Sequence, residues 1–84
     1  MTRMRKGEVQ IRFEILEFLY YGKGQPRTHI WRKATSLSYD DFLKHLAYLE
    51  EKKLIRENSE GACHLTEEGR RLYVELRKSL PSIL

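Results

Sequence analysis

The residues from Thr28 to Thr66 predict a helix, a tight turn, a second helix and a β-hairpin, and this order most constrains the fold. The clearest local signal in this stretch is Ser38-Tyr39-Asp40-Asp41. A serine can accept a hydrogen bond from a backbone N–H of the first helical turn, and a carboxylate three residues later favours the positive helix end. The sequence therefore predicts a helix over residues 39–52 that begins directly after Ser38.

A shorter helix is predicted just before it, over residues 28–34, with Thr28 as its cap. Ile30 and Ala34 are four residues apart, so they lie on one face of that helix. Only the tripeptide Thr35-Ser36-Leu37 separates the two helices, which is the length of a helix-turn-helix connection. We expect its leucine to pack between them.

The residues after the second helix predict a β-hairpin over residues 54–65 and then a final helix. Two strand-length segments flank Asn58-Ser59-Glu60-Gly61, four turn-forming residues that include a glycine. Thr66 is followed by two glutamates and then by leucines at a four-residue spacing. We therefore predict a helix over residues 67–80 that Thr66 caps and Pro81 stops.

A first helix is predicted over residues 8–21, and its apolar side chains occupy two faces. On one side lie Val9, Phe13, Leu16 and Tyr20. On the other side lie Ile11, Ile15, Phe18 and Leu19. One face can serve the core, and the other needs a cover from the last helix or from a second subunit.

We interpret this second apolar face as evidence for a homodimer. The alternative is that the last helix packs across the face within one chain. The side chains assigned to the dimer interface are Val9, Phe13, Leu16, Tyr20, Leu72, Tyr73, Leu76 and Leu80.

The length and the charge of the chain restrict its class and its partners. Its 84 residues fit one domain, with 16 basic and 12 acidic residues and a formal charge of +4. That balance favours a polyanionic partner, although a solvated surface of mixed charge is the alternative. We expect a flexible basic arm over residues 1–6. No apolar run is long enough to span a bilayer, so we expect a cytoplasmic protein with no membrane partner.

The helix over residues 39–52 is predicted to present one side to the core and the other to a partner. Its apolar stripe consists of Phe42, Leu46 and Leu49. The opposite side carries Lys44 and Tyr48, and the major groove of DNA admits one α-helix. Asp40 and Asp41 are interpreted mainly as helix-start residues, because carboxylates repel phosphate. The other residues on or beside the opposite side are Ala47 and Glu51.

Phosphate contacts position a DNA-binding protein, and we assign them to the positive end of the 28–34 helix and to the basic residues around it. The hairpin adds little to this surface, because its tip has no lysine or arginine. Trp31 is interpreted as a core residue, with an interface anchor as the alternative. The residues assigned to DNA binding are Arg27, Thr28, His29, Arg32, Lys33, Ser36, Ser38, Tyr39, Asp40, Lys44, Tyr48 and Arg56.

Catalytic and metal-binding patterns are not found in the sequence. The three histidines and the single cysteine, Cys63, lack zinc-finger spacing, and one cysteine permits no internal disulfide. Cys63 and His64 are neighbours on a predicted strand, so their side chains point to opposite faces and cannot act as nucleophile and base. We predict a protein that is not an enzyme and that holds no metal or cofactor.

The chain resembles the small archaeal winged-helix DNA-binding proteins over roughly residues 15–80. The segments that carry this resemblance are Thr28-His29-Ile30, Leu37-Ser38-Tyr39, Phe42, Leu46, Leu49, Leu54-Ile55 and Leu65-Thr66-Glu67-Glu68-Gly69. The resemblance implies a mainly α fold with a small β-hairpin, the winged helix-turn-helix, built from about four helices and a two-stranded wing. It also implies a transcription regulator or chromatin-like protein of the nucleoid.

Two departures from the family pattern affect these expectations. Lys53 stands where the family has a glycine before the first strand of the wing. Many members dimerise through the last helix as an antiparallel coiled coil, but the 67–80 helix is short for one. We therefore expect an interface formed jointly by the first and last helices.

The function predicted from the sequence is a dimeric regulator that binds double-stranded DNA and inserts the 39–52 helix in the major groove. The alternative is a winged helix that docks proteins within a transcription or replication assembly. The acidic start of the 39–52 helix and the hairpin tip without basic residues favour that alternative. A third possibility is non-specific chromatin packaging.

Overall fold

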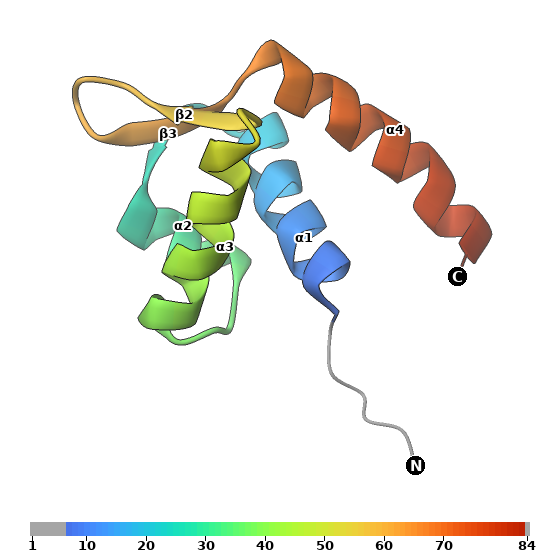
Figure 1. Ribbon diagram of the computed structural model, residues 1–84, viewed down its shortest axis with the longest axis horizontal. Helices are drawn as coiled ribbons and strands as arrows, with labels where there is room; N and C mark the ends of the chain where they lie inside the picture. The colour runs from blue at the N-terminus through green and yellow to red at the C-terminus, as the bar shows by residue number, and fades with distance from the viewer. Residues whose placement is uncertain (1–6, 84) are drawn as a thin grey trace.

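The computed structural model describes residues 7–83 and their side chains as far as Ser79. Within that range four helices accompany a small antiparallel sheet (Figure 1). The elements in chain order are α1 (Glu8–Tyr21), β1 (Gln25–Pro26), α2 (Arg27–Ala34), α3 (Tyr39–Glu51), β2 (Ile55–Glu57), β3 (Ala62–Leu65) and α4 (Glu67–Ile83). The predicted fold class, mainly α with a β-hairpin, is confirmed. No described helix has the length and apolar character needed to cross a bilayer.

Two helix starts follow the capping residues that the sequence predicts. The Ser38 hydroxyl oxygen accepts a hydrogen bond from the Asp41 N–H at 3.2 Å, so α3 begins at Tyr39. The Thr66 hydroxyl oxygen accepts a hydrogen bond from the Gly69 N–H at 3.0 Å at the start of α4. Both hydroxyls satisfy an N–H that has no partner inside the helix.

Two other boundaries differ from the prediction. Helix α2 begins at Arg27 with Pro26 as its cap residue, so Thr28 lies inside the first turn and does not cap it. Proline supplies the extended backbone of that cap, with φ −68°. Helix α4 continues past Pro81 to Ile83. The proline ring removes one N–H donor, but its fixed φ is close to the helical value, which permits the helix to continue.

The sheet contains a strand that the sequence analysis did not predict. Strands β2 and β3 form the expected hairpin, and β1 pairs on the other side of β3 in the order β1-β3-β2. Gln25 lies opposite Cys63, and Pro26 lies opposite Ala62. A two-residue strand has no alternating pattern to detect, and proline is tolerated there because β1 is an edge strand.

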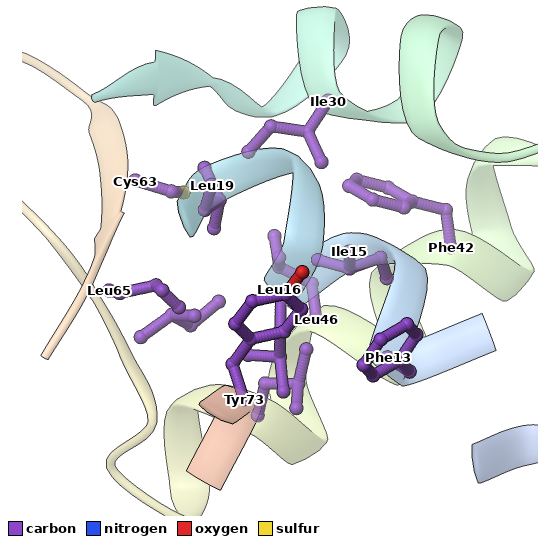
Figure 2. Close-up of a cluster of buried hydrophobic side chains, with 12 residues drawn as sticks. Phe13, Ile15, Leu16, Leu19, Ile30, Phe42, Leu46, Cys63, Leu65 and Tyr73 are labelled. Atoms are coloured by element: carbon purple, nitrogen blue, oxygen red, sulfur yellow. The ribbon is translucent and has the colours of Figure 1, made fainter. Parts of the chain in front are cut away.

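The core is built around α1, which contributes Phe13, Ile15, Leu16 and Leu19 (Figure 2). The predicted inward stripe of α3 is confirmed, because each of its three members is at most 1% exposed. The remaining buried side chains come from α2, the sheet and α4, and they are Ile30, Ile55, Cys63, Leu65 and Tyr73.

Helix α4 covers the second apolar face of α1 within the same chain. Tyr73 is fully buried, and its ring lies 5.2 Å from the ring of Phe13 and 4.5 Å from that of Tyr20. Its hydroxyl donates a hydrogen bond to Glu17 at 3.1 Å, and burial raises the pKa of Tyr73. Phe13, Leu16 and Tyr73 were assigned to a dimer interface, but these side chains are core residues of the single chain.

Gly69 lies where α4 passes closest to the start of the hairpin. A Cβ atom at this position would overlap the carbonyl oxygen of Leu54, which belongs to the backbone and cannot rotate away. Glycine is therefore required for steric reasons at position 69, because any side chain there would keep α4 from approaching the start of the hairpin this closely.

We expect Gly69→Ala to lower the free energy of unfolding by about 1–3 kcal/mol, because the added methyl group separates α4 from the hairpin. Helix propensity alone predicts the opposite sign, a gain of about 1 kcal/mol. Urea unfolding followed by circular dichroism measures the change. Gly24→Ala is the control, because its Cβ would make only an ordinary contact with Ala62 at 3.4 Å. A Gly69→Ala variant as stable as the wild type would contradict the steric explanation.

Candidate nucleic-acid interface

The turn between α2 and α3 is held by Trp31. Its indole N–H donates a hydrogen bond to the Leu37 carbonyl at 2.7 Å, and its ring meets the Tyr39 ring edge-on at 5.1 Å. The Thr35 hydroxyl donates to the Trp31 carbonyl at 2.9 Å, which closes α2. Trp31 is half-buried and packs against the core, so it fixes the orientation of α3 relative to α2.

The side of α3 opposite the core stripe is open. Ser36 and Ser38 are exposed at the entrance to the helix, whereas Tyr39 is half-buried beside Trp31. The exposed side chains along the helix are Asp40, Asp41, Lys44, Ala47, Tyr48 and Glu51. These side chains lie along one face of α3, which runs from the turn at its start to the hairpin at its end (Figure 1).

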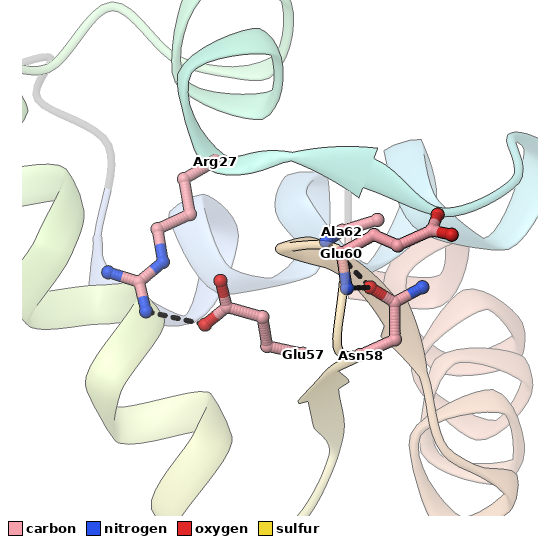
Figure 3. A network of polar contacts seen from close by, with 5 residues as sticks. All are labelled: Arg27, Glu57, Asn58, Glu60 and Ala62. Carbon is pink, nitrogen blue, oxygen red and sulfur yellow. Dashed lines mark hydrogen bonds and ion pairs between the residues drawn. The ribbon is translucent and has the colours of Figure 1, made fainter.

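The hairpin is tied to the start of α2 by an ion pair. The Arg27 guanidinium donates a hydrogen bond to the Glu57 carboxylate at 2.7 Å (Figure 3). This hydrogen bond raises the pKa of Arg27, so the guanidinium charge is already compensated by Glu57. At the tip, the Asn58 side-chain oxygen accepts hydrogen bonds from the N–H groups of Glu60 and Ala62 at 2.9 and 3.0 Å. Arg56 is exposed on β2.

The sequence of the chain matches a family model described as winged helix-turn-helix over residues 5–81. The chain belongs to the winged helix-turn-helix family. The match spans the helices and the hairpin described above, so the hairpin is the wing of this domain. The comparison with curated proteins finds no match.

The exposed polar residues of α2 in this winged helix divide between two directions. His29 lies against α1, with its ring 5.9 Å from the ring of Phe18. Lys33 also faces α1, where it lines a hollow together with Glu14 and Glu17. Thr28 and Arg32 are exposed on the remaining side. The assigned DNA-binding residues of α2 therefore do not form one continuous surface, and Arg32 is the exposed cation that points away from the carboxylates of α1.

Arg12 of α1 lies against the exposed face of α3, and the sequence analysis did not assign it to the site. Its guanidinium carbon lies 3.7 Å from the centroid of the Tyr48 ring, and its Nε donates a hydrogen bond to His45 Nδ1 at 3.3 Å. The Lys52 ammonium lies 5.5 Å from the same ring centroid. The sequence alone could indicate that Lys52 lies near Tyr48, because the two are four residues apart on one helix, but it could not indicate the contact with Arg12.

The residues assigned to the dimer interface that remain outside the core are few. Val9 is 60% exposed and Leu72 is 36% exposed, whereas Tyr20 and Leu76 are half-buried. The side chain of Leu80 lies outside the described residues. The exposed members of this set therefore lie on α4 and in the first turn of α1.

Cys63 is fully buried behind the wing, and burial raises the pKa of its thiol. A thiol that stays protonated and buried is a poor nucleophile and a poor metal ligand. Among residues 7–83 no three histidine, cysteine or carboxylate side chains come together as a metal site would require.

Helix α3 ends in a left-handed residue, and this residue is Lys53 with φ +64°. The Lys53 N–H donates to the Glu50 carbonyl and the Leu54 N–H to the Leu49 carbonyl, both at 2.9 Å. This is the Schellman arrangement, in which glycine is the usual left-handed residue. The glycine of the resembled family is thus replaced by lysine at a position where the backbone favours glycine.

We expect Lys53→Gly to raise the free energy of unfolding by about 0.5–1 kcal/mol, because relief of the left-handed strain exceeds the added entropy of the unfolded chain. Thermal and urea unfolding measure the change. Lys52→Gly is the matched control. Lys52 has φ −79°, which any residue adopts, so glycine there should lower stability. Equal effects at the two lysines would argue against strain at Lys53.

Proposed function

We propose that this winged helix is a dimeric protein that binds double-stranded DNA and regulates transcription, with α3 in the major groove. The observation that carries the proposal is the exposed face of α3, on which Lys44, Ala47 and Tyr48 are exposed and only the edge at Tyr48 is contacted by a described residue of α1, Arg12. The major groove is about 12 Å wide, and an α-helix with its side chains is about 10–12 Å across. A nucleoid-associated location would follow from this role.

Contacts with the DNA backbone are proposed on either side of α3. Ser36 and Ser38 lie at the entrance to the helix, and Arg32 and Thr28 are exposed on the outer side of α2. The formal charge of +4 favours this contact electrostatically. Arg27 is a weaker candidate than the sequence suggests, because Glu57 already compensates its charge. Lys33 is also weaker, because it lies beside the carboxylates of α1.

The proposed DNA binding is tested with duplexes selected from a random pool. Lys44→Ala should weaken binding to the preferred duplex about 5–150-fold while changing unrelated duplexes little, because a base contact is worth about 1–3 kcal/mol. Arg32→Ala should weaken all duplexes alike and reduce the dependence on salt. Lys78→Ala, an exposed position on α4, is the control and should bind as the wild type does. Equal wild-type affinity for unrelated duplexes would instead support non-specific packaging of DNA.

The dimer is proposed to form through the outer side of α4 and the first turn of α1. Leu72 and Leu76 are four residues apart on α4, so they lie on one face, and Val9 in the first turn of α1 is 60% exposed. In Figure 1 α4 diverges from α1 towards its C-terminal end.

We expect the protein to sediment with twice the mass of one chain, 10.1 kDa. Leu72→Glu should give the single-chain mass, because burying an unpaired carboxylate in an apolar interface is costly. Ala47→Glu is the control, since Ala47 lies on α3 and the substitution should leave the mass unchanged. A wild-type protein that sediments as one chain at micromolar concentration would rule out the dimer.

The alternative function is a protein-docking module within a transcription or replication assembly. Two observations favour it: Asp40 and Asp41 are exposed at the start of α3, and the only ion pair described on the wing neutralises Arg27. Recovery of a stoichiometric protein partner without bound DNA, with no salt-dependent affinity for duplexes, would support this alternative over DNA binding.

A further inference from the structure

We infer that Arg12, Tyr48 and Lys52 form a binding site for one phosphate of the DNA backbone, at the junction of α1 and α3. The inference rests on the proposed function and adds a contact from α1, which the helix-turn-helix alone does not supply. The ligand is a phosphodiester oxygen pair beside the major groove, recognised by charge and by hydrogen bonds rather than by base sequence.

Two cations lie close to one partly exposed aromatic ring. The guanidinium of Arg12 is 3.7 Å from the Tyr48 ring centroid, and the ammonium of Lys52 is 5.5 Å from it. Tyr48 is 37% exposed, so solvent and an incoming ligand reach part of the side chain. Arg12 is held in place by the ring and by His45 Nδ1, and ordering in advance lowers the entropy that binding costs.

The positive charge at this junction is only weakly compensated by an exposed carboxylate. Arg12 pairs with Glu8 at 3.6 Å, but the Glu8 side chain is 73% exposed, and such surface pairs are weak. His45 accepts the Arg12 hydrogen bond through Nδ1 and supplies no negative charge. Among the described residues no ion pair engages Lys52. Arg12 and Lys52 each lie within 5.5 Å of the Tyr48 ring centroid, so a phosphate beside that ring is attracted by both charges.

The position of the site relative to α3 fits a strand of DNA beside the groove. Tyr48 and Lys52 are spaced four residues apart, so they form one row of about 6 Å along the helix. The row lies on the α1 side of the exposed face, because Tyr48 contacts Arg12. Lys44, Ala47 and Glu51 lie at the centre of the face. A helix that presents its centre to base edges presents such a row to the flanking phosphates.

The difference from Arg27 explains why this site is favoured over the wing. The Arg27 guanidinium donates to Glu57 at 2.7 Å, so a phosphate would have to displace a carboxylate. At the junction of α1 and α3 the ion pair to be displaced is the longer one with the exposed Glu8, although Asp41 and Glu14 line the same hollow as Arg12. Arginine is suited to this role because its planar group can donate two parallel hydrogen bonds to one phosphate.

The test measures the affinity for two labelled 20-base-pair duplexes of unrelated sequence between 50 and 200 mM salt. Neutralising one phosphate contact reduces the slope of log affinity against log salt by about 0.9. Arg12→Gln and Lys52→Gln should therefore each lessen the loss of affinity over this range, by up to about 3.5-fold because the two cations serve one phosphate, and equally for both duplexes. Tyr48→Phe should weaken binding without changing the slope, because it removes a hydroxyl and no charge.

Three controls separate a phosphate contact from a structural role. Arg12→Lys keeps the charge and should restore the wild-type slope. Arg71→Gln, at an exposed position on α4, should leave the slope unchanged. Thermal unfolding shows which variants are folded. If Arg12→Gln does not fold, Lys52→Gln decides the test alone, since Lys52 is an exposed residue at the end of α3.

The outcomes distinguish this site from the function on which it rests. Wild-type slopes in the Arg12→Gln and Lys52→Gln variants would overturn the phosphate site and leave DNA binding by α3 intact. Reduced slopes in both variants, with restoration by Arg12→Lys, would support it. A wild-type protein with no salt-dependent affinity for either duplex would overturn the proposed function, and the phosphate site with it.

Discussion

The hydroxyl group of Thr66 connects the loop after α3 to the first turn of α4, and the position of α4 depends on it. Its oxygen accepts a hydrogen bond from the Gly69 N–H at 3.0 Å, and the group lies 2.7 and 3.1 Å from the carbonyl oxygens of Lys53 and Leu54. The Thr66 N–H also donates to the Leu54 carbonyl at 3.0 Å. One side chain thus joins the residues that end α3 to the first turn of α4, and Gly69 permits the close approach.

From this junction α4 runs back along α1 and completes the core without a second copy. Tyr73 reaches Phe13, Tyr20 and Glu17, so the face of α1 that an isolated three-helix unit would expose is covered within the chain. An apolar helix face needs a cover, but the sequence does not identify which cover it receives. The proposed dimer therefore depends on the outward side chains of α4 and not on the buried face of α1.

Some cations of the domain are engaged by carboxylates within the fold, whereas others lie beside the exposed face of α3. Arg27 fastens the wing to α2, and Lys33 lies beside the carboxylates of α1. These two cations contribute little to the potential around α3. Arg12 differs from them. In the sequence nothing distinguishes it from the other polar residues of α1, but in the structure it lies against Tyr48 on the exposed face of α3. The sequence gives the sign of a residue's charge, whereas the neighbours from other elements decide whether that charge can contact a partner.

The sequence by itself determined what local spacing controls. Three kinds of feature involve residues within a few positions of each other, so the sequence alone predicts them. They are the caps at Ser38 and Thr66, the buried stripe of α3 and the hairpin turn at Asn58–Gly61. The boundaries of α3 and of the hairpin strands were predicted to within one residue for the same reason.

The tertiary structure alone decided the contacts between distant residues. Strand β1 exists because Gln25 meets Cys63, Arg12 meets His45 across 33 positions, and Tyr73 meets Glu17 across 56. The sequence also did not predict that α2 begins at Arg27, directly after Pro26, which pairs with β3. No periodicity links such partners along the chain. They meet only because burial of the apolar faces of α1 and α4 fixes how the elements pack.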